Sequence, residues 1–512
     1  MPSPQRSMPD RVLARIGLPS TSSRVAVATV AAFVVGSAVS IEAASAILVA
    51  ARDWVIHYFG WLFVLVATLA VVVVAGLAIH PRAGERLGPA GSRPEFGNLA
   101  WFAMLFSAGL ASGVLYWATA EPITHQQGNP FIGGYGGEGG RAAVTTAMRL
   151  TVLHWGLHGW AFYVLAGLGI AIYSYRHGRP LTFRSAFYPL LGPKYIDRWP
   201  GLAVDLIAVF GTVCGVSTSI GLSAAAMNAT LGSLFQIDVD ISNQIVIVFA
   251  VCLLGTLSAV SGLARGIRRL SEANVWLSAL LLIAFAVVGP TTFLAGLFVE
   301  TLIDYVVHVL PTGMWLAETP EHEEWQAAWT LFYWGWWLAW TPFVGLFIAR
   351  ISRGRTVREF CVAVMLVPTL VTIVWMSVFG GTALYQEIAS PGSVSAAVNQ
   401  DYSLGIATVI DNLGRPTIGV LLTGTAALLL LTWLITSLDS ATLVMCHLLG
   451  TDEAAPAKVF WGVALAMTTT VLLLAGGLPA LQAASIVIGL PLALLMVLLI
   501  GGILRDLAKR RL

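Results

Sequence analysis

The chain is a succession of apolar segments, each long enough to cross a lipid bilayer as a helix, joined by short polar connections. A bilayer core needs about 20 apolar residues per helix. The composition agrees, because 57% of the 512 residues are hydrophobic and only 11% are charged, where a soluble protein has about 25% charged residues. Twelve segments are predicted, at about residues 25–50, 57–79, 97–120, 144–173, 201–234, 243–263, 271–297, 326–350, 359–384, 416–446, 457–476 and 481–504. The sequence therefore predicts an all-α polytopic membrane protein.

Basic residues indicate the orientation, because cytoplasmic loops collect Lys and Arg. With the N-terminus inside, the outer side holds only Arg52, Arg141, Arg149 and Arg415. The first apolar run is longer than the roughly 7–15-residue apolar region of a signal peptide, so we expect it to be retained as a span. These features predict a multi-pass membrane protein with both termini in the cytoplasm.

Spacing and charge divide the chain. An acidic, partly amphipathic segment after the seventh span suits an interfacial helix from Phe298 to Leu310. The predicted parts are a cytoplasmic tail (1–24), two additional N-terminal helices (25–80), a first set of five helices (97–297), a periplasmic interfacial helix and linker (298–325), a second set of five (326–504) and a short cytoplasmic tail (505–512). Five plus five helices is typical of transporters built from inverted repeats, which bind solute at the midplane between the repeats.

One stretch, from Trp329 to Phe360, is unusually aromatic. It reads WTLFYWGWWLAWTPFVGLFIARISRGRTVREF and contains Trp336, Trp337 and Trp340. An interfacial belt needs fewer aromatic residues than this. A desolvated cation without hydrogen-bond donors needs electron-rich ring faces to replace its water. The stretch indicates a membrane protein that moves a quaternary-ammonium-like solute.

The fourth span, with HWGLHGWAFY, adds further rings. Trp155, Trp160 and Tyr163 would form one box with the tryptophans of the eighth span, although packing of the aromatic residues in a core is the alternative. His154 and His158 have a spacing that suits a metal, but no further ligand is expected nearby. We interpret these two histidines as helix-packing residues.

Two other spans carry small or polar groups. Gly109 and Gly113 in the third span form GxxxG, which indicates either close helix packing or a turn that unwinds and exposes carbonyls to an ion. The tenth span contains Thr436, Ser437 and Asp439 within an apolar run. Hydroxyls there suit Na⁺, or they bond between helices. Asp439 is expected to anchor a helix end.

These stretches together resemble the betaine/choline/carnitine transporter (BCCT) family. The resemblance rests on the tryptophan-rich motif, HWGLHGWAFY, AEP after the third span, FGTVCGVSTSIGLS, VWMSVFGGTALY and TSLDSA, and it extends from about residue 50 to 505. It implies a LeuT-type core of two inverted five-helix repeats, and a homotrimer.

The resemblance also implies binding residues. The substrate box would comprise Trp155, Trp160, Tyr163 and Trp337, lined further by Trp336, Trp340, Gly109, Leu110, Ala111, Ser112 and Gly113. A first sodium site would comprise Ser107, Leu110, Trp433, Thr436 and Ser437. A second would involve Thr212 and Phe343, although Val216 stands where the family has a hydroxyl.

Departures from the family pattern bear on the substrate and on coupling. Exchangers of the family carry a basic side chain where this chain has Val275, which favours Na⁺ coupling. Choline-type members carry an acidic residue where this chain has Gly113, which favours a zwitterion that brings its own carboxylate. Ala111 and Ser112 replace residues of the betaine-type pattern, so carnitine or a sulfonium analogue such as dimethylsulfoniopropionate stays open. The short C-terminal tail offers little material for osmotic sensing.

The sequence thus predicts a secondary transporter that takes up a glycine-betaine-like solute by Na⁺ symport with alternating access. A sodium-independent exchanger of the carnitine type is the alternative, and a channel is a third possibility. Neither HExxH nor GxSxG occurs, so no enzyme is expected. No cofactor is expected besides the coupling ion, and no nucleic acid partner.

Overall fold

In the computed structural model, the chain is described over residues 20–89, 91–109, 113–132, 140–261, 264–449 and 455–509. Within these ranges the elements are helices, joined by turns and one isolated bridge between Arg86 and Thr356. Twelve of the described helices are long and apolar enough to cross a membrane. The predicted class, an all-α polytopic membrane protein, is confirmed.

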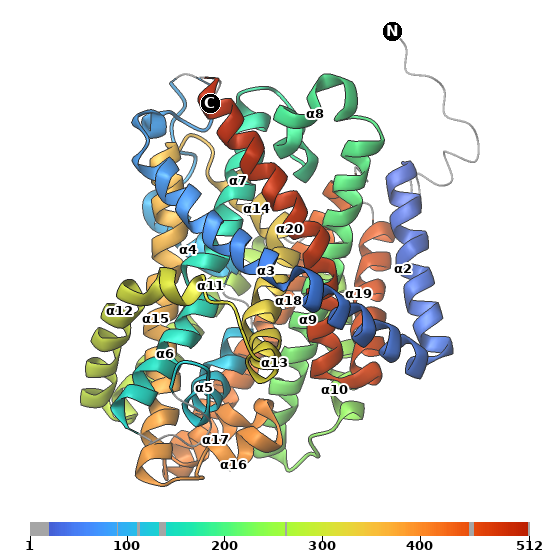
Figure 1. The fold of residues 1–512 in the computed structure, drawn as a ribbon. Coiled ribbons are helices and arrows are strands. Elements are labelled where there is room, and N and C mark those ends of the chain that lie inside the picture. Colours follow the sequence, from blue (N-terminus) through green and yellow to red (C-terminus); the bar gives the residue numbers. More distant parts are fainter. Residues whose placement is uncertain are drawn as a thin grey trace.

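The helices follow one another along the chain, and several are continuous with a short 3₁₀ or π turn (Figure 1). Their bounds are α2 Thr21–Val39, α3 Ile41–Ile79, α4 Asn98–Gly109, α5 Gly113–Gln127, α6 Arg141–Trp155, α7 Leu157–Tyr175, α8 Tyr188–Tyr195, α9 Trp199–Phe235, α10 Ile241–Ser261, α11 Ala264–Val288, α12 Thr291–Gly313, α13 Pro320–Gln326, α14 Phe332–Ile351, α15 Val357–Ala389, α16 Ser395–Gln400, α17 Gly405–Asp411, α18 Pro416–Leu448, α19 Ala455–Gly476 and α20 Leu478–Ala508.

The first two spans divide earlier than predicted. The sequence places the break between residues 50 and 57, near Arg52 and Asp53, but the chain turns at Ser40 instead. Ser40 is extended, and its side chain caps α3 by accepting the Ala43 N–H. Arg52 and Asp53 pair with each other at 2.7 Å and stay inside α3. The helix is therefore about 58 Å long, and it runs obliquely across the bundle (Figure 1).

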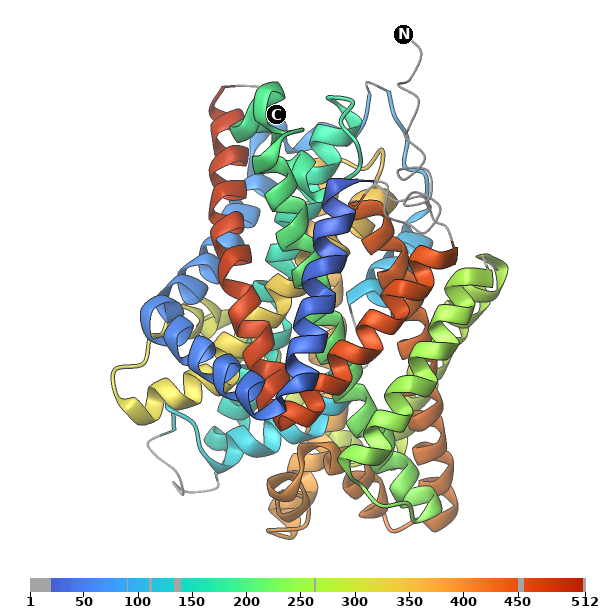
Figure 2. The same ribbon diagram turned by 90° about the vertical axis from the view of Figure 1, so that its right-hand side faces the viewer.

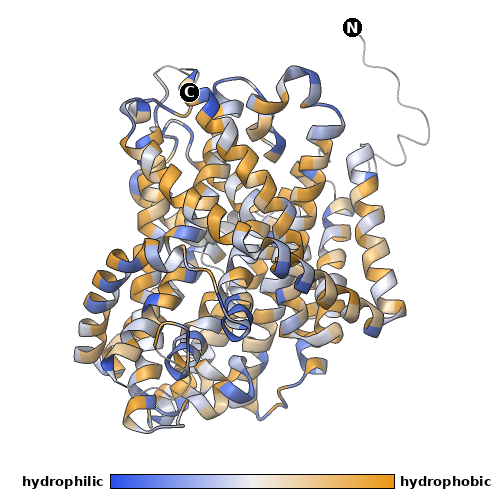
Figure 3. Ribbon diagram, in the orientation of Figure 1, coloured by the Kyte–Doolittle hydropathy of each residue, from blue (hydrophilic) through white to orange (hydrophobic). Residues whose placement is uncertain are grey.

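The aromatic helix α14 lies at the centre of the molecule. It packs against α7, α9 and α20, and nearly all of its residues are buried. By contrast, α11 and α12 are mostly exposed, and so is α2, which lies at the front of the bundle in Figure 2. Hydrophobic residues dominate the middle of the ribbon, while hydrophilic ones gather toward its two ends (Figure 3). The tryptophans of α14 therefore face other helices rather than a lipid interface.

The linker after the seventh span also begins earlier than predicted. Gly289 and Pro290 end α11, so the helix that was expected from Phe298 starts at Thr291. It packs on α6 and α15 and carries two ion pairs with α6. Glu300 pairs with Arg141, and Asp304 pairs with Arg149 at 3.2 Å. The division of the chain at residue 298 stays a prediction.

A break in the fourth span shapes the site. Gly156 separates α6 from α7 with a non-helical backbone, φ −100° and ψ −138°. A Cβ there would lie 2.5 Å from the Tyr305 hydroxyl oxygen and 2.6 Å from the Val152 carbonyl oxygen, so only glycine fits. The Tyr305 hydroxyl accepts the Leu157 N–H at 2.9 Å. This bond satisfies a backbone donor that the helix break would otherwise leave without an acceptor.

Candidate functional site

A cavity lies where α6 and α7 meet α14 and α9. Its lining residues are Gly113, Trp155, Tyr163, Ser219, Trp336, Trp337 and Trp340. Five of the six aromatic residues predicted for the box line this cavity. The sixth, Trp160, lies behind the wall and packs on Trp337 and Tyr163. The structure thus brings together rings from two separate spans.

Trp337 is the central ring of this group. Its centroid lies 5.0 Å from that of Tyr163, 5.7 Å from that of Trp160 and 6.2 Å from that of Trp155. The contacts are tilted or edge-to-face, which is the geometry that aromatic quadrupoles favour. Gly159 on α7 provides the space for this ring, because a Cβ there would overlap the fused atoms of the Trp337 indole.

Hydrogen bonds fix the orientation of the indole rings. Trp337 Nε1–H donates to the His154 carbonyl at 2.8 Å, which lies beside the break at Gly156. Trp336 and Trp340 both donate to the Gly215 carbonyl of α9, at 3.3 and 2.9 Å. The polar edges of these three rings are therefore occupied, which leaves the π-faces as the chemistry that the rings offer to a solute.

The cavity is small in this conformation and adjoins a larger one. Its volume is about 30 Å³, enough for two or three water molecules at about 10–15 Å³ each. The second cavity holds about 550 Å³, and Trp340 lines both. Its remaining lining residues are Phe96, Ala100, Ala103, Met104, Ser271, Glu272, Val275, Phe343, Phe347, Thr436, Ser437 and Ser440. The rings of the small cavity must therefore separate before a solute with three methyl groups fits among them.

The predicted residues of the third span are only partly described. Gly113 begins α5 and lines the small cavity, where a Cβ would lie 2.5 Å from Trp336 Cη2. Leu110, Ala111 and Ser112 lie outside the described residues. For Ser107 and Gly109 only the helical backbone of α4 is described.

The predicted sodium ligands of the tenth span face the larger cavity. Thr436 and Ser437 line it, halfway along α18. The Thr436 hydroxyl donates to the Trp433 carbonyl at 2.9 Å and accepts from Asn274 Nδ2 at 3.3 Å. Trp433 is buried, and its ring centroid lies 6.0 Å from that of Trp375. The side chains of Thr436 and Ser437 thus border the larger cavity, where an ion could reach their hydroxyl groups.

Residues of the second predicted sodium site lie on different helices. The buried Thr212 hydroxyl donates to the Ala208 carbonyl of its own helix at 2.8 Å. Phe343 packs edge-to-face on Trp340, 5.2 Å between centroids, and lines the larger cavity. Val216 is buried and offers no oxygen from its side chain.

Asp439 has a structural partner. Its carboxylate accepts the Ser258 hydroxyl at 2.7 Å, and Ser258 lies in the last turn of α10. Lys458 of α19 donates to the Ala259 carbonyl of the same turn at 2.9 Å. Asp439 therefore anchors the end of α10, in agreement with its expected role at a helix end.

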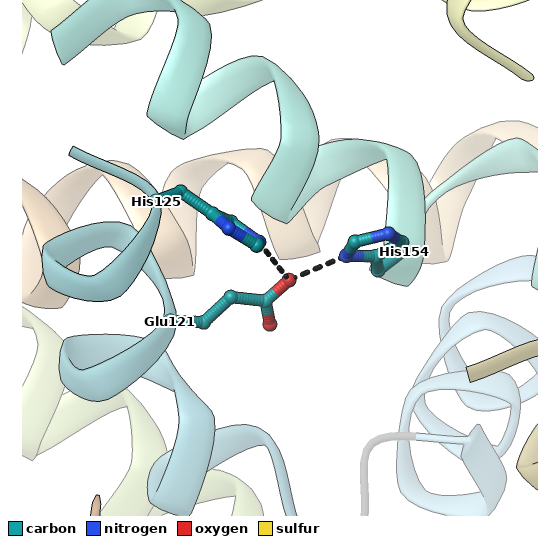
Figure 4. A group of neighbouring side chains, drawn as sticks. All are labelled: Glu121, His125 and His154. Atoms are coloured by element: carbon teal, nitrogen blue, oxygen red, sulfur yellow. Dashed lines mark hydrogen bonds and ion pairs between the residues drawn. The ribbon is translucent and has the colours of Figure 1, made fainter. Parts of the chain in front are cut away.

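The expectation that no acidic or histidine partner lies near His154 is wrong. Glu121 and His125, one turn apart on α5, lie beside His154 of α6 (Figure 4). Glu121 Oε1 is 2.7 Å from His154 Nδ1 and 3.3 Å from His125 Nε2. These are hydrogen-bond contacts, and all three side chains are fully buried. The local signal was Glu121 and His125 at i, i+4 directly after the predicted third span, but the contact with α6 is long-range.

His158 has a different environment from His154. Its ring stacks on Trp334 with centroids 5.2 Å apart and lies against Gly313 of α12. The two histidines at i, i+4 do not converge, because the break at Gly156 lies between them. The interpretation of His158 as a packing residue agrees with this environment.

Comparison with known proteins assigns the family. The sequence model of the BCCT, betaine/carnitine/choline family transporters, matches residues 23–512. This chain belongs to the BCCT family. It is a transporter, not an enzyme.

Individual BCCT relatives resemble this chain over most of their length. The chain is 37% identical to the glycine betaine transporter OpuD of Bacillus subtilis, over 95% of this chain and 94% of the relative. It is 36% identical to a probable glycine betaine transporter of Desulfitobacterium hafniense, over 88% and 89%. It is 35% identical to the high-affinity choline transport protein of Escherichia coli, over 89% and 67%. BCCT relatives of this chain therefore include transporters of both solutes.

Proposed function

We propose that this BCCT transporter takes up a zwitterionic quaternary-ammonium solute of the glycine betaine type. The observation that carries the proposal is the cavity walled by Trp155, Tyr163, Trp336 and Trp337. Trimethylammonium has no N–H donor, so only π-faces and distant charges compensate it for lost water. Because the described wall offers mostly ring faces, with hydroxyls only on Tyr163 and Ser219 and no carboxylate, it suits a methylated cation better than an amine that needs several hydrogen-bond acceptors.

The proposed wall positions follow from this cavity. Trp155, Tyr163 and Trp337 contact the ammonium group directly, and Trp160 supports Trp337 from behind. Trp340 lines both cavities, so we assign it to the path between the box and the larger cavity. Gly113 leaves room for the substrate beside Trp336. Carnitine, choline and sulfonium compounds are the alternative substrates, and a thermal-shift panel of these compounds and glycine betaine, each with Na⁺ or K⁺, distinguishes them.

Sodium symport is the proposed coupling. Thr436 and Ser437 line the larger cavity, and hydroxyl oxygens are ligands that a hard cation accepts. No basic side chain replaces the ion at Val275, which also lines this cavity. A coupling ion and a solute drive each other only if both favour the same conformational state. We propose alternating access on that basis, with an ion site in the second half of the chain.

The coupling is tested by uptake into proteoliposomes. We expect labelled glycine betaine to accumulate with an inward Na⁺ gradient and not with an equal K⁺ gradient. Uptake that ignores the Na⁺ gradient, together with counterflow in its absence, would instead establish the sodium-independent exchanger. A non-saturable flux would indicate a channel.

A threonine of α18 provides a sharper test of the ion site. Thr436→Val should weaken the apparent affinity for Na⁺ about tenfold, because one favourable contact to a charged group is worth about 1.5 kcal/mol. Uptake at saturating Na⁺ should persist. The matched control is Thr425→Val on the same helix, since Thr425 does not line the larger cavity and its hydroxyl donates to the Leu421 carbonyl of its own helix. Equal Na⁺ affinity in the two variants would rule Thr436 out as a ligand.

The proposed setting is a bacterial plasma membrane with both termini in the cytoplasm. The start of α2 and the end of α20 lie at the same end of the bundle (Figure 1), as an even number of spans requires. We propose a homotrimer on the family resemblance, and the mass of the detergent-solubilised complex tests that assembly.

A further inference from the structure

Glu121 is a buried carboxylate whose oxygens are both occupied by donors. Oε1 faces His154 Nδ1 at 2.7 Å and His125 Nε2 at 3.3 Å. Oε2 accepts Trp155 Nε1–H at 3.0 Å and the Tyr333 hydroxyl at 2.5 Å. The donors come from α5, α6 and α14, and the carboxylate is fully buried. Each of these four groups can donate a hydrogen bond to Glu121, and an ionised carboxylate only accepts, so this arrangement of donors suits the ionised form.

The two imidazoles do not neutralise this charge, because a proton on His125 Nδ1 would meet no acceptor among the described residues and His154 carries a single proton. The arrangement that gives both nitrogens of His154 a partner places a proton on Nδ1, which donates to Glu121, while Nε2 accepts the Thr330 hydroxyl at 3.2 Å. That ring is neutral. Among the described residues, Glu121 pairs with no Lys or Arg. A buried charge without a cationic partner is costly, so a cation placed nearby gains energy from it.

Trp155 connects this charge to the small cavity. Its indole N–H is hydrogen-bonded to Glu121, while its ring lines the cavity and packs edge-to-face on Trp336 and Trp337, at 5.8 and 6.2 Å. A carboxylate that accepts an indole N–H raises the electron density of that ring. The face of such a ring attracts a cation more strongly.

We propose that Glu121 is the fixed counter-charge for the cationic head of the solute, and that it acts through Trp155 as a positioning and specificity-determining residue. This inference rests on the proposed function. The solute ammonium provides the positive partner that Glu121 lacks. The transporter therefore selects a cationic head over an uncharged head of the same shape. The Tyr333 hydroxyl also donates to the Glu121 carboxylate. Tyr333 thereby connects Glu121 to α14, the helix that carries Trp336 and Trp337.

The test compares two probes of equal shape in the full chain in detergent. Glycine betaine carries a trimethylammonium head, and 3,3-dimethylbutanoate carries a tert-butyl head on the same carboxylate. Glu121→Gln keeps the side-chain volume and removes the charge. We expect this substitution to weaken betaine binding about tenfold, because it removes part of the attraction between the cation and the rings. The affinity for dimethylbutanoate should stay the same or increase. Glu121→Asp keeps the charge but withdraws it from Trp155, and should weaken betaine about threefold.

The outcomes separate the hypotheses. An equal loss for both probes in Glu121→Gln would show that Glu121 only supports the packing, and unchanged betaine binding would show that its charge is irrelevant. Either result overturns the inference. If Glu121→Gln is not recovered folded, Glu121→Asp decides by the same comparison of the two probes. Failure of the wild-type protein to bind betaine would instead overturn the proposed function.

Discussion

Trp337→Leu should weaken the binding of glycine betaine by about 30- to 100-fold. The substitution removes the ring that contacts Trp155, Trp160 and Tyr163. A desolvated cation–π contact is worth about 2 kcal/mol, which is about 30-fold in affinity. The lost indole N–H also leaves the His154 carbonyl without its donor at 2.8 Å. Binding is measured by equilibrium titration, and transport by uptake into proteoliposomes.

The matched control for this variant is Trp461→Leu. Trp461 is also a buried tryptophan, but it lies on α19 and packs on Phe460, away from the residues that line the cavity. Both variants lose similar apolar area, so both should lower thermal stability. Only Trp337→Leu should change the affinity for betaine. Similar affinities in the two variants would show that Trp337 does not contact the solute.

Gly159→Ala should reduce transport at least tenfold although it favours helix formation. Alanine in place of glycine within a helix stabilises it by about 1 kcal/mol. The Cβ, however, would overlap the fused ring atoms of Trp337 and lie 2.7 Å from its Cε3. Overpacking of this kind costs about 1–3 kcal/mol and shifts the neighbouring ring. Because hydrogen bonding and packing fix the Trp337 ring, its shift disturbs the whole wall of the cavity.

The control for this prediction is Gly424→Ala on α18. A Cβ at Gly424 meets no described atom within 4 Å, so the substitution changes helix propensity alone. Its transport should equal that of the wild-type protein. Undiminished uptake by Gly159→Ala would mean that the position of the Trp337 ring is unimportant for the solute.

Much of the fold and of the box was predictable because the signals are local. Apolar runs define the spans whatever their neighbours are, and tryptophans cluster within HWGLHGWAFY and again within the eighth span. These two clusters lie far apart along the chain, and the family resemblance implied that they form one box. The break between α2 and α3 was not predictable in this way. Arg52 and Asp53 read as a connection in the sequence, but their charges pair with each other and remain in the helix.

The network around Glu121 was missed for a different reason. Its partners Trp155 and Tyr333 lie 34 and 212 residues away along the chain. Sequence spacing describes neighbours on one helix, and it says nothing of which faces of different helices meet. The His154–His158 pair looked like a unit because of its spacing, yet the break at Gly156 separates the two rings.

The conformation of the cavity was also beyond the sequence. Ring identity predicts which residues form the wall, but the separation of the rings depends on how α6, α7 and α14 pack. The small cavity holds about 30 Å³ and the adjoining one about 550 Å³. The proposed solute therefore requires movement of helices or rings, and the proposed alternating access would provide it.

The most direct measurement is a cryo-electron microscopy structure of the protein with glycine betaine and Na⁺. The account predicts density for the trimethylammonium group between the faces of Trp155, Tyr163 and Trp337, within about 6 Å of each ring centroid. Density for the solute at another position, with these rings still closed on one another, would contradict it.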